Sequence, residues 1–155
     1  MMLHKTSEQK KSRLVTQLSS ILHDDWRVPR KQEDGTFKSR TKKTKDNTWS
    51  EKHGTNEVDI ANTDYVNLPK DWKSEYIISA EVAMDEIYKA IENGQELNDG
   101  FVEQASEVIH IKWLERNGSW APAEQNKPYA KLSDKEKGKD RVIIKRAVEI
   151  FHSAK

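Results

Sequence analysis

The sequence lacks cysteine altogether and contains few residues that break helices, with four prolines and six glycines. Without cysteine, the chain can form neither disulfides nor cysteine-ligated metal centres. No segment approaches the roughly 18 apolar residues that a membrane-spanning helix requires. The first residues, from Met1 to Lys5, also lack the apolar run of a signal peptide. We therefore expect a cytoplasmic protein with no membrane partner and no cofactor.

A strong net charge is also missing, because 27 basic and 26 acidic residues leave a formal charge of +1. Such a balance creates no long-range field that attracts nucleic acid. The charge is uneven, however, since residues 36–45 contain five basic side chains and no acidic one. These side chains are Lys38, Arg40, Lys42, Lys43 and Lys45. Nucleic-acid binding through this stretch is an alternative that the overall charge balance disfavours.

Apolar residues recur at helical spacing in four segments, which predicts a mainly α-helical fold. Pro29 ends the first segment, Pro69 opens the second, and Gly94 ends the second. Ser133, with Glu136 three residues on, forms a capping box before the last helix. The helices fall into two pairs, and a polar loop separates the members of each pair.

We predict one domain over residues 1–155, built from two related helix pairs. The first repeat spans residues 6–93 and includes a long basic loop, 30–64, and the second repeat spans residues 97–153. A loop of that length is unusual in a small domain, so we expect it to carry function. Short β-strands, or a hairpin around Gly35, are expected in the connecting loops. Two such pairs can share a core that neither pair completes alone.

Corresponding residues in the two repeats favour an internal duplication with pseudo-symmetric halves. The pairs are His23 and His110, Trp26 and Trp113, Trp49 and Trp120, Tyr65 and Tyr129, Leu68 and Leu132, Lys73 and Lys137, and Ala83 and Ala147. The spacing agrees from the tyrosines onward, whereas the first loop carries additional residues before its tyrosine. The alternative is two ordinary amphipathic helix pairs that share these residues by chance.

Four sequence elements follow one another between residues 101 and 153. They are an Ile-His-x-x-Trp stretch ending at Trp113, a loop tryptophan at Trp120, a Pro-Tyr-x-x-Leu turn from Pro128, and a Glu-Lys-x-x-Asp-Arg helix start from Glu136. In this order they resemble the ryanodine receptor repeat (RyR) domain. The first half resembles that family more loosely, because it lacks the Glu-Lys-x-x-Asp-Arg element. A serine or threonine also stands where the family has glycine before each loop tryptophan.

The resemblance implies a free-standing prokaryotic or viral version of that domain, with a cleft between two helical repeats. It implies that the cleft holds a nucleotide-like small molecule, an adenine nucleotide or a related signalling nucleotide, without catalysis. In a phage, such a protein would act against host defence by sequestering a nucleotide signal. A homo-oligomer is compatible with this interpretation. A protein–protein interaction module that uses the same tryptophan-lined cleft is the alternative.

The candidate ligand contacts are the two loop tryptophans, the nearby cations and the tyrosines that precede the second helix of each pair. They are Trp49, Trp120, Lys38, Arg40, Lys43, Lys45, Tyr65, Tyr129 and Arg116. Indole rings stack on bases, with about 1–3 kcal/mol per stack, and lysine or arginine binds phosphate. The alternatives are tryptophans that fold back onto the core and a basic loop that is simply solvated.

No catalytic constellation is visible, so we predict that the protein is not an enzyme. The sequence contains no Gly-x-x-x-x-Gly-Lys phosphate loop, no Gly-x-Ser-x-Gly elbow and no metal-binding His-Glu-x-x-His pattern. His23 and His110 each precede a tryptophan by about one helical turn. We expect these two histidines to pack at helix ends and not to bind a metal.

Overall fold

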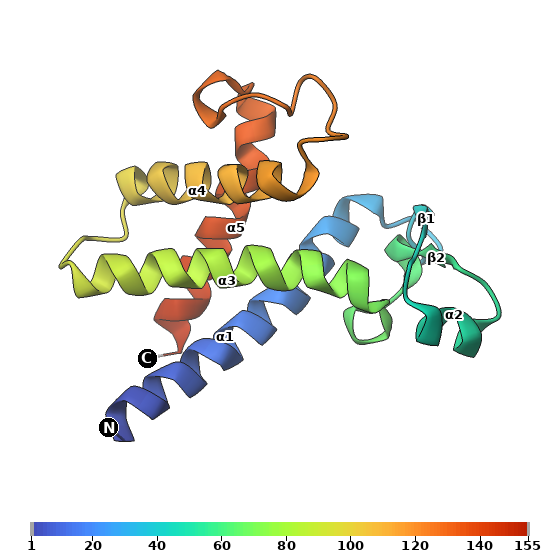
Figure 1. Ribbon diagram of the computed structural model, residues 1–155, viewed down its shortest axis with the longest axis horizontal. Coiled ribbons are helices and arrows are strands. Elements are labelled where there is room, and N and C mark those ends of the chain that lie inside the picture. Colours follow the sequence, from blue (N-terminus) through green and yellow to red (C-terminus); the bar gives the residue numbers. More distant parts are fainter. Residues whose placement is uncertain (1, 155) are drawn as a thin grey trace. The chain divides into compact units, whose positions relative to one another are not determined.

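The computed structural model describes residues 2–154, and the chain divides into two compact units (Figure 1). We call the first the bundle unit, which comprises residues 2–18 and 79–154. The second, which we call the loop unit, comprises residues 19–78. Both boundaries fall inside long helices, so that two helices contribute turns to both units.

The fold is mainly α-helical, as the apolar spacing predicts. The described residues form the α-helices α1 (Met2–Arg27), α2 (Asn47–His53), α3 (Lys70–Glu92), α4 (Asp99–Asn117) and α5 (Asp134–Ser153). Two short strands lie in the first loop, β1 (Thr41–Lys43) and β2 (Glu57–Asp59). Single 3-10 turns occur at η1 (Val28–Arg30), η2 (Ile60–Asn62), η3 (Tyr65–Asn67) and η4 (Tyr129–Lys131).

Side-chain caps begin three of the described helices, and Asp46 caps α2 by accepting a hydrogen bond of 3.1 Å from the backbone N–H of Trp49. The Ser133 hydroxyl accepts a hydrogen bond of 3.2 Å from the backbone N–H of Glu136, which confirms the predicted cap of α5. Asn98 caps α4 in the same way, with a bond of 3.0 Å to the N–H three residues on. The first helix, α1, begins at Met2, before the predicted start of the first repeat at residue 6. The residues before Thr6 include leucine, methionine and lysine, which are good helix formers.

The long first loop contains the predicted strands and the predicted hairpin. β1 and β2 pair antiparallel, and Lys43 lies opposite Glu57, where opposite charges stabilise the pairing. A separate antiparallel bridge joins Lys31 to Phe37. Gly35 lies in the turn between them with a φ of +89°, a conformation that glycine adopts without steric cost.

The core of the bundle unit consists of apolar side chains from its helices. The buried members include Leu14, Leu18, Ala80, Ala83, Met84, Ile87, Phe101, Ala105, Ile109, Ile144, Ala147 and Phe151. The alanines let helix backbones approach closely, and α5 packs across α4 (Figure 1). Burying one large apolar side chain contributes about 1.5–3 kcal/mol, so this core carries much of the stability of the unit.

The loop unit has a smaller core, which aromatic rings complete. Its buried centre consists of Val58, Ile60 and Leu68. The half-buried aromatic side chains that pack against it are Trp26, Trp49, Tyr65, Trp72 and Tyr76. The indole N–H of Trp72 donates a hydrogen bond of 3.2 Å to the carbonyl oxygen of Lys43, so a core ring also holds the loop backbone.

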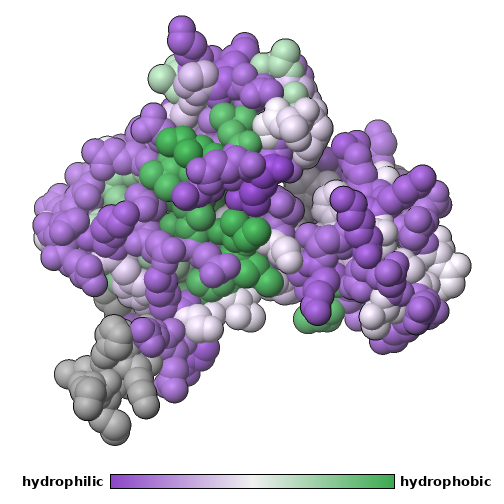
Figure 2. Space-filling model, in the orientation of Figure 1, coloured by the Kyte–Doolittle hydropathy of each residue, from purple (hydrophilic) through white to green (hydrophobic). Residues whose placement is uncertain are grey.

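The surface is largely hydrophilic on the face drawn in Figure 2, where hydrophobic side chains gather mainly over the bundle unit. The exposed large hydrophobic residues are Val28, Val66, Ile91, Ile111, Trp120 and Val142. None of the helices in residues 2–154 combines the length and the hydrophobicity needed to cross a bilayer.

Shortening Ile144 should destabilise the protein far more than the same change at Ile111, because Ile144 is 0% exposed and Ile111 is 47% exposed. Ile144→Ala should lower the free energy of unfolding by about 2–5 kcal/mol, through lost burial and the cavity that remains. Ile111→Ala should cost less than about 1 kcal/mol. Urea titrations followed by circular dichroism measure both values, and equal losses would place Ile144 outside the core.

Candidate functional site

A buried histidine connects the end of α4 to the loop before α5. His110 is 4% exposed, and its Nε2 lies 2.6 Å from the carbonyl oxygen of Lys127. Because a carbonyl oxygen can only accept, Nε2 carries the proton and donates it. The imidazole also stacks on Trp113, with ring centroids 6.1 Å apart and an interplanar angle of 14°. The hydrogen bond and the stack together fix the position of the Trp113 ring.

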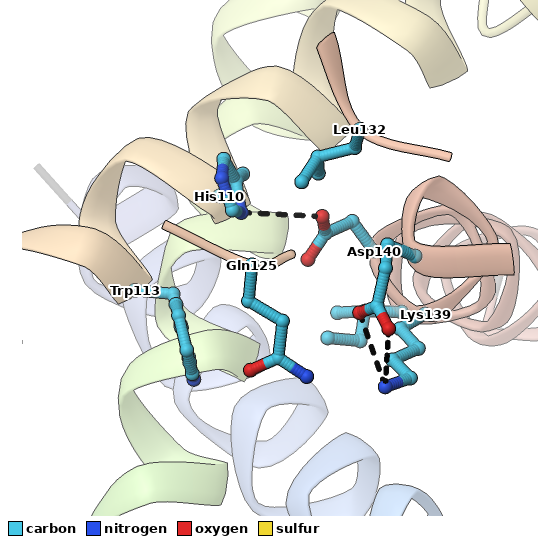
Figure 3. A pocket seen from close by; sticks show the side chains of 8 residues that line it. His110, Trp113, Gln125, Leu132, Lys139 and Asp140 are labelled. Atoms are coloured by element: carbon cyan, nitrogen blue, oxygen red, sulfur yellow. Dashed lines mark hydrogen bonds and ion pairs between the residues drawn. The ribbon is translucent and has the colours of Figure 1, made fainter. Parts of the chain in front are cut away.

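The Trp113 ring forms one wall of a pocket of about 250 Å³ in the bundle unit. The pocket is lined by His110, Trp113, Gln125, Leu132, Glu136, Lys139, Asp140 and Ile143. Figure 3 shows the Trp113 ring across the pocket from Asp140 and Lys139, with Gln125 drawn between them. An aromatic wall that faces a few convergent polar groups is typical of a small-molecule site.

Asp140 is a mostly buried carboxyl group in this pocket. Burial, followed by the nearby Glu136 carboxylate, raises the pKa of Asp140 from 3.8 to about 7, while the Lys139 ammonium opposes the rise. Its Oδ2 lies 3.7 Å from Nδ1 of His110, which allows a charge interaction but is too long for a good hydrogen bond. A ligand N–H group that donates to this carboxyl would therefore favour its ionised form near neutral pH.

The loop unit contains the same arrangement around His23. Nε2 of His23 donates a hydrogen bond of 2.7 Å to the carbonyl oxygen of Thr63. The ring stacks on Trp26 with centroids 6.1 Å apart and an interplanar angle of 15°. Burial lowers the pKa of His23, so Nδ1 stays unprotonated and accepts a hydrogen bond of 3.0 Å from the Tyr76 hydroxyl.

We call this set of contacts the His–Trp motif, and corresponding residues hold it in both units. The pairs are His23 and His110, Trp26 and Trp113, Thr63 and Lys127, Tyr65 and Tyr129, Lys73 and Lys137, and Tyr76 and Asp140. The ammonium of Lys73 lies 5.8 Å from the Tyr65 ring centroid, and that of Lys137 lies 5.5 Å from the Tyr129 centroid. The local geometry therefore agrees with four of the residue pairs found in the sequence, which are those of the histidines, the tryptophans that follow them, the tyrosines and the lysines.

Trp49, a predicted ligand contact, folds back onto the core of the loop unit. It lies in α2 and packs half-buried against the cluster that includes Val58. Its Nε1 donates a hydrogen bond of 2.9 Å to the carbonyl oxygen of Asn67. Its ring stacks on His53 with centroids 3.9 Å apart. This placement corresponds to the alternative in which the loop tryptophan covers the core.

Trp120, the other predicted tryptophan, is 65% exposed. It meets Trp113 edge-on, with centroids 6.0 Å apart and an interplanar angle of 66°. Trp120 thus adds aromatic surface next to the pocket wall. The predicted contact Arg116 also lies near the end of α4, where its guanidinium donates a hydrogen bond of 3.1 Å to the carbonyl oxygen of Lys112.

The predicted phosphate-binding cations of the first loop are Lys38, Arg40, Lys43 and Lys45. All four side chains are exposed in the loop unit. Backbone groups of this stretch hold the loop, since Lys45 N–H donates a hydrogen bond of 3.0 Å to the Asp71 carboxylate. Among the described side chains, no hydrogen bond, ion pair or ring contact joins these cations to Trp49. Their contact with phosphate stays a prediction that rests on charge and exposure.

The predicted tyrosines begin the 3-10 turns that precede α3 and α5. The buried Tyr129 donates a hydrogen bond of 3.0 Å to the Glu103 carboxylate. Arg141 binds the same carboxylate through two hydrogen bonds of 2.7 and 2.8 Å. Tyr65 is half-buried in the aromatic shell of the loop unit. Both tyrosines therefore have structural partners within their own unit.

None of the pocket-lining residues is among the ligand contacts that the sequence predicts. The sequence nevertheless contained a signal for the pocket, because four of its lining residues belong to the Ile-His-x-x-Trp and Glu-Lys-x-x-Asp-Arg elements. These residues are His110, Trp113, Glu136 and Asp140. Helical spacing shows which side chains share a helix face, but it does not show where two packed helices leave a space.

No protein-family model, no curated protein and no solved structure matches the chain. Within the part of the chain whose side chains are described, no three histidine or acidic side chains are placed to hold a metal ion. The pocket is therefore interpreted from its own geometry.

Asp140→Asn should change how stability depends on pH. Because the folded pKa of Asp140, about 7, lies above its ordinary 3.8, the folded protein binds more protons than the unfolded chain between these values. This group therefore lowers the free energy of unfolding as the pH rises from about 4 to about 7. Asparagine cannot ionise, so the variant should gain on the order of 2 kcal/mol relative to the parent between about pH 5 and pH 8.

The measurement is urea unfolding of both proteins across that pH range. Asp134→Asn, which removes an exposed carboxylate from the first turn of α5, is the matched control and should leave the pH dependence unchanged. Parallel stability profiles for the parent and Asp140→Asn would contradict a buried, protonated Asp140.

Proposed function

We propose that the protein is a non-catalytic binding module that holds a nucleotide-like small molecule. The pocket beside Trp113, where an indole ring faces polar groups of α5, is the observation that carries the proposal. A flat base would stack on the indole and gain about 1–3 kcal/mol. Its polar edge would face Asp140, whose carboxyl group accepts N–H donors when it is ionised.

The charge of the pocket favours the base of a nucleotide over its phosphate. Glu136 and Asp140 bring two carboxyl groups to the lining, and Lys139 brings one ammonium. That ammonium lies 3.1 Å from the Glu136 carboxylate, so part of its charge is already compensated. A phosphate among these groups would meet like charge, which is costly in a partly desolvated site. The phosphate of a bound nucleotide would therefore stay at the mouth of the pocket, in contact with water.

Two features of the pocket support binding without catalysis. His110 already donates its Nε2 proton to a backbone carbonyl, which fixes the orientation of the imidazole. The lining residues also include no serine, threonine or cysteine, the hydroxyl and thiol nucleophiles of covalent catalysis. We therefore propose that a ligand in this pocket is held and not transformed.

The resemblance to the RyR domain is consistent with this proposal, because three of its elements contribute to the pocket walls, including the Pro-Tyr-x-x-Leu turn through Leu132. His110 and Trp113 come from the first element, and Glu136 and Asp140 come from the last. A module that holds a nucleotide without turnover withdraws it from other proteins. Sequestration of a nucleotide signal, as by a phage protein acting against host defence, is therefore part of the proposal.

A protein–protein interaction module is the second candidate function, and Trp120 favours it. This side chain is 65% exposed and lies beside another tryptophan. Tryptophan is enriched among the residues that dominate the binding energy of interfaces. A stoichiometric protein partner lost in Trp120→Ala, together with no small molecule in the pocket, would favour this candidate.

Replacing Trp113 should weaken nucleotide binding at least about tenfold, because the variant loses the stacking wall. Isothermal titration calorimetry of adenine and guanine nucleotides against the purified protein and Trp113→Ala measures the change. Trp113→Phe keeps an aromatic face and should retain part of the affinity.

Trp49→Ala is the control, because that tryptophan lies in the loop unit and covers its core. Circular dichroism establishes that each variant keeps its helices. A nucleotide that binds Trp113→Ala as tightly as the parent would place the site elsewhere. Failure of every nucleotide to bind the parent would contradict the proposed function.

A further inference from the structure

We infer that the pocket beside Trp113 recognises a guanidine-type group, a planar group that presents two adjacent N–H donors. This inference rests on the proposed function and narrows its ligand. Such a group occurs in a guanidinium cation and along one edge of the guanine base. The basis is that the loop unit already holds a guanidinium over its own equivalent tryptophan.

Arg30 is that guanidinium. Its Cζ lies 4.0 Å from the centroid of the Trp26 ring, the counterpart of Trp113. Its Nη1 donates a hydrogen bond of 3.2 Å to the carbonyl oxygen of Trp26. The charges of Arg30 and Arg27 also act on the Tyr76 hydroxyl, where they oppose the rise of its pKa to about 12 that burial causes. Arg30 therefore lies over the tryptophan and within electrostatic reach of the residue that corresponds to Asp140.

The residue that corresponds to Arg30 in the bundle unit is Asn117, since each lies four residues after its tryptophan. The Asn117 amide donates a hydrogen bond of 3.1 Å to the carbonyl oxygen of Trp113, so it makes the same backbone contact as Arg30. The asparagine side chain is too short to extend over the indole ring as well. The site that the chain covers with its own arginine in one unit is an open pocket in the other.

The residue on the opposite wall of the pocket also differs between the two units. The motif places a neutral Tyr76 hydroxyl in the loop unit, where it already donates to His23. In the bundle unit it places Asp140, whose carboxylate can accept two parallel N–H groups from one planar donor. An indole face attracts a planar cation as well as a base. The open site thus has an aromatic face and an acceptor pair that suit a guanidine-type group from outside.

The experiment titrates the full chain with matched pairs of probes by isothermal titration calorimetry. GMP is compared with AMP, whose base lacks two adjacent donors, and methylguanidinium is compared with methylammonium. We expect at least about tenfold tighter binding of the guanidine-type member of a pair, the scale of a hydrogen bond to a charged group. A GMP preference identifies a guanine base as the source, and a methylguanidinium preference alone identifies a guanidinium cation.

Absence of both preferences would overturn the inference. If a nucleotide still bound the parent and bound Trp113→Ala more weakly, the proposed function would stand, but the ligand would not be limited to guanidine-type groups. If neither the probes nor any nucleotide bound the parent, both the proposed function and this inference would be wrong.

Asn117→Arg introduces an arginine into the bundle unit at the position that corresponds to Arg30, and the new side chain should fill the pocket. Affinity for the preferred probe should fall at least about tenfold. Gln104→Arg is the matched control, because it adds the same charge at an exposed position of α4 and should bind like the parent. Parent-like affinity in a folded Asn117→Arg would overturn the equivalence of the two sites.

Asp140→Asn supplies a second test that does not require an arginine in a confined site. Asparagine removes the carboxylate acceptor pair but keeps the size of the side chain. The preference for GMP over AMP, or for methylguanidinium over methylammonium, should fall to near unity. A preference that survives in this variant would overturn the assigned role of Asp140.

Discussion

A buried imidazole that donates one hydrogen bond to a backbone carbonyl connects, in each unit, the end of one helix to the loop that leads into the next. His23 and His110 make this contact, at 2.7 and 2.6 Å. A buried carbonyl left without its donor costs about 1–3 kcal/mol, so the contact constrains the loop as well as the helix. Each imidazole also stacks on the tryptophan that follows it, which fixes the position of the indole ring.

The His–Trp motifs of the two units differ at two corresponding positions. Arg30 covers Trp26, whereas Asn117 makes the equivalent backbone contact and Trp113 lines a pocket. The residue that faces the histidine from the next helix is Tyr76, with a hydroxyl group, in the loop unit and Asp140, with a carboxyl group, in the bundle unit. One unit is thus closed by its own side chain, and the other presents an acidic pocket with an aromatic wall.

The four long helices and the cap of α5 could be predicted because they depend on local spacing and on a serine followed by glutamate, whereas the short helix α2 in the first loop was not predicted. Four of the six residue pairs of the His–Trp motif could also be found, whereas the pairing of Thr63 with Lys127 and of Tyr76 with Asp140 emerged only from the structure. The roles of the tryptophans could not be predicted. Trp49 lies outside any apolar periodicity in the sequence, yet its ring packs against the cluster that contains Val58. Val58 lies in the three-residue strand β2, which is too short to show the two-residue periodicity of a strand. Trp113 has the spacing of a core residue, yet its ring lines a pocket between packed elements of the bundle unit.

A crystal structure of the protein with GMP or methylguanidinium tests the central claim most directly. We expect a planar group parallel to the Trp113 ring, with its N–H donors toward the Asp140 carboxylate. A pocket filled by the Gln125 side chain, with the ligand bound elsewhere or absent, would contradict it.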